Sequence, residues 1–273
     1  MKGASAQRAV ARAGDFQLVV EGVSKRFGGV TAVQDVSLEV PRGGIVSIIG
    51  PNGAGKTSLL NMISGFYKPD TGRVVLEGQD ITQKKPSDVA ALGIARTFQN
   101  IALFSGLTVL DNLMLGRHVR MKAGVLSSVI YWGMAQKEDI AHREAIEEII
   151  EFLKLQDLRK QPTASLAYGL RKRVELGRAL ASDPKVLLLD EPMGGMNQDE
   201  KEDMARYVLD VNQERGVTVV LIEHDMGVVM DISDKVVVLD RGRGIAVGTP
   251  DEVQRNPKVV EAYLGTSKSG GKA

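Results

Sequence analysis

The chain has 273 residues, which is enough for one large domain or two small ones, and 43% of them are hydrophobic. A net charge of +1 gives no indication of nucleic-acid binding. The absence of cysteine excludes disulfides and cysteine-ligated metals, and it suits a reducing compartment.

The two ends of the chain differ in composition from the rest. Residues 1–14 are rich in Ala, Arg and Gly and lack the apolar stretch of a secretory signal. Residues 265–273 are rich in Gly, Ser and Lys. We expect both to be flexible tails around a single domain at 15–264. Since no apolar run approaches the roughly 18 residues that a membrane span needs, we expect no direct span.

Four short apolar runs predict buried parallel strands, because their hydrophobicity is continuous rather than alternating. They are Ile45–Ile49, Val186–Leu189, Val217–Ile222 and Val236–Leu239. Helical stretches between them predict an α/β core. Alternating segments predict a separate antiparallel sheet with one wet face, formed by Phe16–Glu21 and Val36–Val40 with Val74–Glu77 and Ile245–Val247 as further candidates.

Residues 100–165 have a different character and predict a helical subdomain. Helices are expected at Val109–Arg117, Lys137–Leu155 and Asp157–Gln161. The second of these carries one apolar stripe, which indicates a helix lying on a larger body. The stripe consists of Ile140, Ile146, Ile149, Ile150 and Leu153.

The segment Gly50–Thr57 fits the pattern G-x-x-x-x-G-K-[ST] of a phosphate-binding loop. It lies between a predicted strand and a helix-like segment, Ser58–Ser64, which is the context that the motif needs. Lys56 is expected to reach the β and γ phosphates, and the Thr57 hydroxyl to ligate Mg²⁺. The expected nucleotide contacts are Gly50, Pro51, Asn52, Gly53, Ala54, Gly55, Lys56, Thr57 and Ser58.

Two acids, Asp190 and Glu191, follow a predicted buried strand. The first suits a second contact to Mg²⁺, and the second suits a base that accepts a proton from an attacking water. Taken alone, the pair is also explained as the acidic N-terminus of a helix. Their position downstream of a phosphate loop favours the catalytic interpretation.

A third element, Leu166–Leu170 with the sequence L-A-Y-G-L, precedes a helix-like segment and lies before Asp190. Here the chain resembles the ATP-binding cassette of ABC transporters, whose L-S-G-G-Q signature opens a helix about twenty residues before the second acidic motif. The resemblance implies a P-loop NTPase (RecA-like) α/β core with a parallel sheet, an antiparallel β subdomain and an inserted α-helical subdomain. It also implies that the signature caps the γ-phosphate of an ATP held by the opposite subunit, through Leu166, Ala167, Tyr168 and Gly169.

The signature departs from the family pattern at two positions. Ala167 replaces the serine whose hydroxyl would donate to the γ-phosphate, and Leu170 replaces the final glutamine. One lost bond of this kind costs on the order of 1–3 kcal/mol. Because backbone donors remain, we expect a weakened or retuned site that still works. Asn197 also stands where the family usually carries Asp, so a contact across the subunit interface loses a charge.

Other positions match the family residue by residue. Gln99 matches the Q-loop residue that touches Mg²⁺ and water and links the core to the helical subdomain. His224 matches the switch histidine that reads the γ-phosphate, and Phe27 matches the aromatic residue that stacks on adenine. The core and β subdomain are then expected at 15–99 and 166–264, with the helical subdomain at 100–165.

Finer features resemble the branched-chain (hydrophobic) amino-acid uptake branch of the family. They are Phe27–Gly29, Arg96–Gln99, Ile222–Met226 and Val260–Gly265. The resemblance implies an ATPase motor of an importer for such amino acids or for related small polar or carboxylate solutes. Its partners would be a second cassette, two transmembrane permeases and, indirectly, a solute-binding protein. Its place would be peripheral, on the cytoplasmic face of the plasma (inner) membrane.

Three alternatives stay open. A lipid or lipopolysaccharide exporter would share every catalytic residue. A soluble ABC ATPase of DNA repair or translation is disfavoured, because the roughly 65 residues between Gln99 and Leu166 show no sustained heptads and only one cassette is present. A regulator without turnover is disfavoured by intact Lys56, Asp190, Glu191 and His224. The apolar stretch Val125–Trp132 fits either a packed core helix or an exposed patch that docks on a permease.

Overall fold

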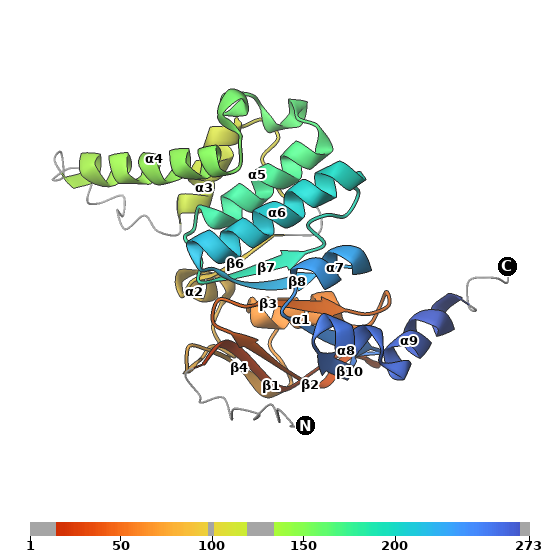
Figure 1. Ribbon diagram of the computed structural model, residues 1–273. Helices are drawn as coiled ribbons and strands as arrows, with labels where there is room; N and C mark the ends of the chain where they lie inside the picture. Colours follow the sequence, from red (N-terminus) through yellow and green to blue (C-terminus); the bar gives the residue numbers. More distant parts are fainter. Residues whose placement is uncertain (1–14, 98–100, 119–133, 268–273) are drawn as a thin grey trace, which may run out of the picture.

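The computed structural model describes residues 15–97, 101–118 and 134–267. These residues form two sheets and a set of helices that cover them (Figure 1). No helix among the described residues is long and apolar enough to cross a membrane.

The larger sheet has six strands in the order β10-β9-β3-β8-β7-β6. Its strands are β3 (Ile45–Ile49), β6 (Ile94–Arg96), β7 (Val186–Asp190), β8 (Thr218–Ile222), β9 (Lys235–Asp240) and β10 (Arg243–Gly248). All pairings are parallel except that of β10 with β9. Every residue of β3, β7 and β8 is buried. The four predicted parallel strands are therefore confirmed.

The smaller sheet is antiparallel, in the order β2-β1-β4-β5. Its strands are β1 (Phe16–Phe27), β2 (Val30–Pro41), β4 (Thr71–Leu76) and β5 (Gln79–Asp80). The expectation that Ile245–Val247 joins this sheet is wrong, because β10 pairs with β9 in the larger sheet. Between β9 and β10, Arg241 and Gly242 both have positive φ, as in the two-residue turns that fold a chain back on the preceding strand.

The helices are α1 (Lys56–Ile63), α2 (Pro86–Ala91), α3 (Val109–Arg117), α4 (Met134–Phe152), α5 (Tyr168–Leu180), α6 (Gln198–Arg215), α7 (Met226–Ile232), α8 (Pro250–Gln254) and α9 (Pro257–Ser267). One face of the larger sheet packs on α1 and the smaller sheet, so that Val46 and Ile48 share a core with Leu18. The other face packs on the helical layer, where Leu187 and Leu189 meet residues of α3 to α6. Coverage of both faces explains the continuous hydrophobicity of its strands.

Among the described residues between 101 and 165, two α-helices, α3 and α4, overlap helices predicted from the sequence. α3 has the predicted bounds and begins with a capping box in which Thr108 and Asp111 bond each other's backbone amides. The predicted stripe on α4 is buried except at its start, where Ile140 is 48% exposed. The helix expected at Asp157–Gln161 is only a 3-10 turn at Gln156–Leu158, because Pro162 disfavours helical backbone at the residue before it. Val125–Trp132 lies outside the described residues.

Candidate nucleotide-binding site

The site is assembled at one edge of the larger sheet, where three neighbouring strands end. β8 lies between β3 and β7, and all three run parallel. The phosphate loop follows β3, Glu191 follows β7, and His224 comes two residues after β8. The carboxyl edge of such a sheet is where ligands bind in open α/β folds.

The backbone of the phosphate loop requires glycine at two positions. Gly50 has φ +148°, and a Cβ there would lie 2.0 Å from the carbonyl oxygen of Leu239. Gly55 has φ +98° and precedes α1 as its N-cap; a Cβ there would lie 2.3 Å from the carbonyl oxygen of Ala32. Helix α1 starts at Lys56, two residues earlier than expected, so its N-terminus points into the loop as anion binding demands.

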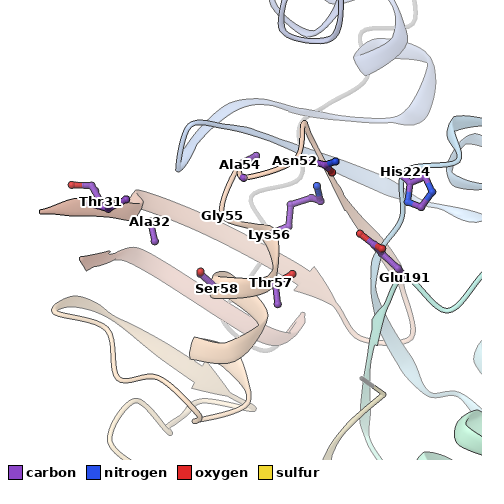
Figure 2. Close-up of a pocket in the computed structure, with 12 residues that line it drawn as sticks. Thr31, Ala32, Asn52, Ala54, Gly55, Lys56, Thr57, Ser58, Glu191 and His224 are labelled. Carbon is purple, nitrogen blue, oxygen red and sulfur yellow. The ribbon is translucent and has the colours of Figure 1, made fainter. Parts of the chain in front are cut away.

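A cavity of about 720 Å³ lies over this loop. Figure 2 shows that the loop, the β1–β2 hairpin and the side chains of Glu191 and His224 surround it. The described residues that line the cavity are Val30, Thr31, Ala32, Asn52, Gly53, Ala54, Gly55, Lys56, Thr57, Ser58, Glu191 and His224. Of the expected contacts, the segment from Asn52 to Ser58 therefore lines one space with Glu191 and His224.

Lys56 is the buried cation of the site and is only 7% exposed. Its ammonium donates to the carbonyl oxygens of Gly50 at 2.7 Å and of Pro51 at 3.2 Å. Burial lowers the pKa of Lys56, and the nearby carboxylates of Glu191 and Asp190 act in the opposite direction. Gly50 and Pro51 thus hold the Lys56 ammonium in place, and neither is among the described residues that line the cavity.

Asp190 is paired through one of its carboxylate oxygens. Its Oδ2 accepts a bond of 2.9 Å from Arg96, with the two side chains 1% and 7% exposed. Arg96 also donates to Asn61 at 2.6 Å and to Ser64 at 3.1 Å, so it ties β6 and β7 to α1. Burial raises the pKa of Asp190, while Arg96 opposes the rise. Among the described residues, Asp190 Oδ1 is buried and lacks a hydrogen-bond partner.

This orphaned oxygen fits a role in holding Mg²⁺. Magnesium is typically bound by one or two protein oxygens together with substrate phosphates and waters. Thr57 lines the cavity beside Lys56, and Asp190 lies close enough to Lys56 to influence its pKa. No cluster of three or more metal-binding His, Cys, Asp or Glu occurs in the described part of the chain. The donor set therefore suits an ion that arrives with a nucleotide.

Glu191 and His224 are held differently from each other. Glu191 has a left-handed backbone with φ +50°, which is uncommon outside glycine. Its amide donates to the carbonyl oxygen of Ile222 at 2.9 Å, and its own carbonyl oxygen accepts from Lys172 at 3.5 Å. The His224 side chain is 61% exposed and open to the cavity.

The L-A-Y-G-L segment lies at the start of α5, apart from the described residues that line the cavity. Ala167 is the N-cap of α5 and provides no side-chain cap. The ring of Tyr168 lies near Gly195, where a Cβ would be 3.2 Å from it. Leu166 and Gly169 are buried. Asn197 caps α6 by accepting from the amide of Glu200, so its side chain has a local partner.

Two expected residues lie away from the cavity lining or cannot be placed. Phe27 is 42% exposed and packs edge-to-face on Tyr67, with the ring centroids 5.0 Å apart. Gln99 lies outside the described residues.

Sequence reasoning missed the hairpin residues Thr31 and Ala32, the Arg96 pairing and the buried Glu223. Arg96 lies in the segment Arg96–Gln99 and Glu223 in Ile222–Met226, and both segments resemble the amino-acid uptake branch; this resemblance was the only sequence signal for a role of either residue. Reasoning also missed Tyr263 of α9, which packs on a cluster that includes Ile49. Burial raises the pKa of Tyr263, and the nearby backbone of Gly50 opposes the rise.

A strand, a glycine-rich loop and a helix that cradle phosphates, with Lys56 and Glu191 beside them, define a P-loop nucleotide-binding protein. Residues 33–194 match the ABC transporter family, and residues 245–268 match the family described as branched-chain amino acid ATP-binding cassette transporter. The chain therefore belongs to the ABC transporter family, as an ATP-binding subunit whose activity is ATP hydrolysis.

Relatives agree with this placement. The chain is 38% identical to the high-affinity branched-chain amino acid transport ATP-binding protein BraF of Pseudomonas aeruginosa, over 91% of this chain and 97% of that protein. It is equally identical, with the same coverage, to LivG of Escherichia coli, a protein with the same description. A nucleotide-free ATP-binding cassette from an ABC transporter has a TM-score of 0.79 and 38% identity, covering 91% of this chain and 98% of that one.

Proposed function

We propose that this chain is the ATP-hydrolysing motor subunit of an ABC importer for branched-chain or other hydrophobic amino acids, or for related small polar or carboxylate solutes. The observation that carries the ATPase role is the single cavity lined by the phosphate loop, Glu191 and His224. The substrate class is supported by the C-terminal match at residues 245–268 and by the transport described for BraF and LivG.

Within the site, Lys56 and the loop amides bind the β and γ phosphates of ATP, and Phe27 stacks on the adenine. Thr57, Asp190 and Gln99 would hold Mg²⁺, which spreads the charge that develops on the phosphates. Glu191 orients a water for in-line attack and accepts its proton, and His224 contacts the γ-phosphate. The exposed imidazole and the strained backbone at Glu191 support a site arranged around its substrate.

The site is completed by a second cassette. Leu166, Ala167, Tyr168 and Gly169 lie apart from the cavity lining of their own subunit, which supports their presentation to an ATP bound by a partner. The dimer would sit peripherally on the cytoplasmic face of the inner membrane, on two permeases fed by a solute-binding protein. The helical subdomain at 100–165 would carry the motion of closure to those permeases.

The test uses Glu191→Gln, with Glu77→Gln as a matched control because Glu77 is not among the described residues that line the cavity. Glu191→Gln should bind ATP, stay dimeric and hydrolyse slowly, while the control should hydrolyse ATP at the normal rate. Unchanged hydrolysis by Glu191→Gln would show that the base is assigned wrongly.

The same variant identifies the partners. We would solubilise membranes with ATP present and capture the tagged Glu191→Gln chain. Recovery of two permeases, a second cassette and a solute-binding protein supports the importer. Permeases with lipid-export components and no binding protein would support the exporter instead. Recovery of ribosomal or DNA-repair proteins, or of this chain alone, would refute the transport role.

A further inference from the structure

Glu223 is a buried carboxylate that the mechanism above does not use. It follows β8 and is 1% exposed, directly before His224. Its Oε1 accepts from the backbone amide of Met193 at 2.9 Å, and its Oε2 accepts from the amide of His224 at 3.2 Å. The two oxygens therefore bind one segment each: the turn that follows β7 and the segment that follows β8.

The turn that Glu223 anchors carries the proposed base. Met193 is two residues after Glu191, whose backbone is held at φ +50°. A left-handed backbone at a residue other than glycine is strained and persists only where its surroundings hold it. On one side, the Glu191 amide is held by Ile222. On the other side, the bond from Met193 to Glu223 holds the chain beyond Glu191.

Glu223 lies behind the groups that are proposed to contact the nucleotide. It is absent from the described residues that line the cavity, whereas its neighbours in the site, Glu191 and His224, are present. Its Oε2 is 3.9 Å from Nδ1 of His224, too far for a hydrogen bond to the imidazole. The contacts of Glu223 are therefore with the backbone of the two segments and lie behind the reacting groups.

We propose that Glu223 is a positioning residue that clamps the Glu191 turn to the His224 segment and so fixes the base relative to the γ-phosphate. The proposal rests on the assignment of Glu191 as the base. A carboxylate suits the task because both of its oxygens accept. A glutamine of the same shape has only one accepting oxygen, so one of the two amides would face its NH₂ group.

The test is a double-mutant cycle on single-turnover ATP hydrolysis by the full chain, with Glu223→Gln, Glu191→Gln and the double variant. Misplacing a reacting group by about 1 Å can cost about 100-fold. We therefore expect Glu223→Gln alone to slow hydrolysis by roughly 10- to 100-fold, with the Kd for ATP changed by less than about threefold. In the Glu191→Gln background, the same substitution should change the rate by less than about threefold, because the base that it positions is already gone.

Each outcome decides a different claim. If Glu191→Gln alone hydrolyses normally, the base assignment fails. If Glu191→Gln is slow but Glu223→Gln slows hydrolysis equally in both backgrounds, the clamp is refuted and Glu223 acts independently of the base. A normal rate for Glu223→Gln also refutes it. Glu223→Asp keeps both carboxylate oxygens on a shorter side chain and should hydrolyse ATP faster than Glu223→Gln. If Glu223→Gln does not fold, Glu223→Asp replaces it in the double-mutant cycle. Glu77→Gln is the control for a general effect of losing a glutamate.

Discussion

Replacing Arg96 with methionine should destabilise the protein in a pH-dependent way. The substitution keeps the bulk of the side chain but leaves the Asp190 carboxylate, 1% exposed, without its cation. Breaking a buried ion pair on one side costs about 3–5 kcal/mol. An upper limit follows from protonation: with the ordinary aspartate pKa of about 3.9, neutralising the carboxylate at pH 7 costs about 4 kcal/mol. We expect a loss of about 3–4 kcal/mol at pH 7.

The direction of the pH dependence follows from the burial of Asp190, which raises its pKa; removing Arg96 removes an opposing influence and raises it further. A carboxyl with a raised folded-state pKa favours the folded state at low pH, and that contribution disappears as the pH rises through the folded-state pKa. The stability deficit of Arg96→Met should therefore shrink by up to about 1.4 kcal/mol for each unit of pH decrease below 7.

The assay is urea unfolding followed by circular dichroism at pH 5, 6, 7 and 8, without nucleotide or Mg²⁺. Arg42→Met is the matched control, because Arg42 pairs with Glu77 at the surface and such pairs contribute about 0–1 kcal/mol. A deficit below about 1 kcal/mol for Arg96→Met at pH 7, or one that is equal at pH 5 and pH 8, would refute the reasoning.

Three further predictions concern single positions. Gly50→Ala should lose about 2 kcal/mol or more of stability and most of its ATP affinity, because the new Cβ would meet a backbone oxygen of β9. Gly53→Ala, where the new Cβ has open space around it, should lose about 1 kcal/mol of stability. Urea unfolding and ATP titration test both variants. Ala167→Ser should stabilise the nucleotide-free chain by about 1 kcal/mol, because the serine hydroxyl supplies the side-chain N-cap that α5 lacks. The same variant should hydrolyse ATP faster. An unchanged ATPase rate would show that Ala167 does not retune the site. Hydrogen bonds from Lys185 and, to a smaller extent, Arg42 lower the pKa of Glu77 to about 2. Glu77→Gln should therefore lose about 1 kcal/mol of stability at pH 7, and this loss should shrink as the pH decreases from 4.5 towards 2. A loss of stability that is constant from pH 6 to pH 3 would contradict this.

Much of the fold was predictable because the signals are local. Burial on both faces leaves a continuous apolar run such as Val186–Leu189, and a phosphate loop leaves a glycine and lysine pattern with fixed spacing. The sheet that one alternating segment joins was not predictable in this way. The alternation at Ile245–Val247 indicates one wet face, but it does not say which of two sheets the strand joins; the turn at Arg241 and Gly242 decides that.

The site was predictable where its residues lie in motifs with known spacing, as in the segment from Gly50 to Thr57. The roles of Arg96 and Glu223 were not, because each depends on a partner distant in the sequence: Arg96 pairs with Asp190, and Glu223 with the amide of Met193. A buried arginine or glutamate has no periodicity of its own, and only the fold shows which group compensates its charge.

The position of β3 in the larger sheet has a consequence for the order in which the protein folds. β3 pairs on one side with β8 and on the other with β9, and Val46 lies opposite Lys235. At about 5–20 residues per second, synthesis reaches those partners roughly 10–40 s after β3. During that time the apolar strand that carries the phosphate loop lacks both of its sheet neighbours. We therefore expect the nucleotide site to be among the last parts of the chain to form, with Ile45–Ile49 unpaired until β8 and β9 emerge.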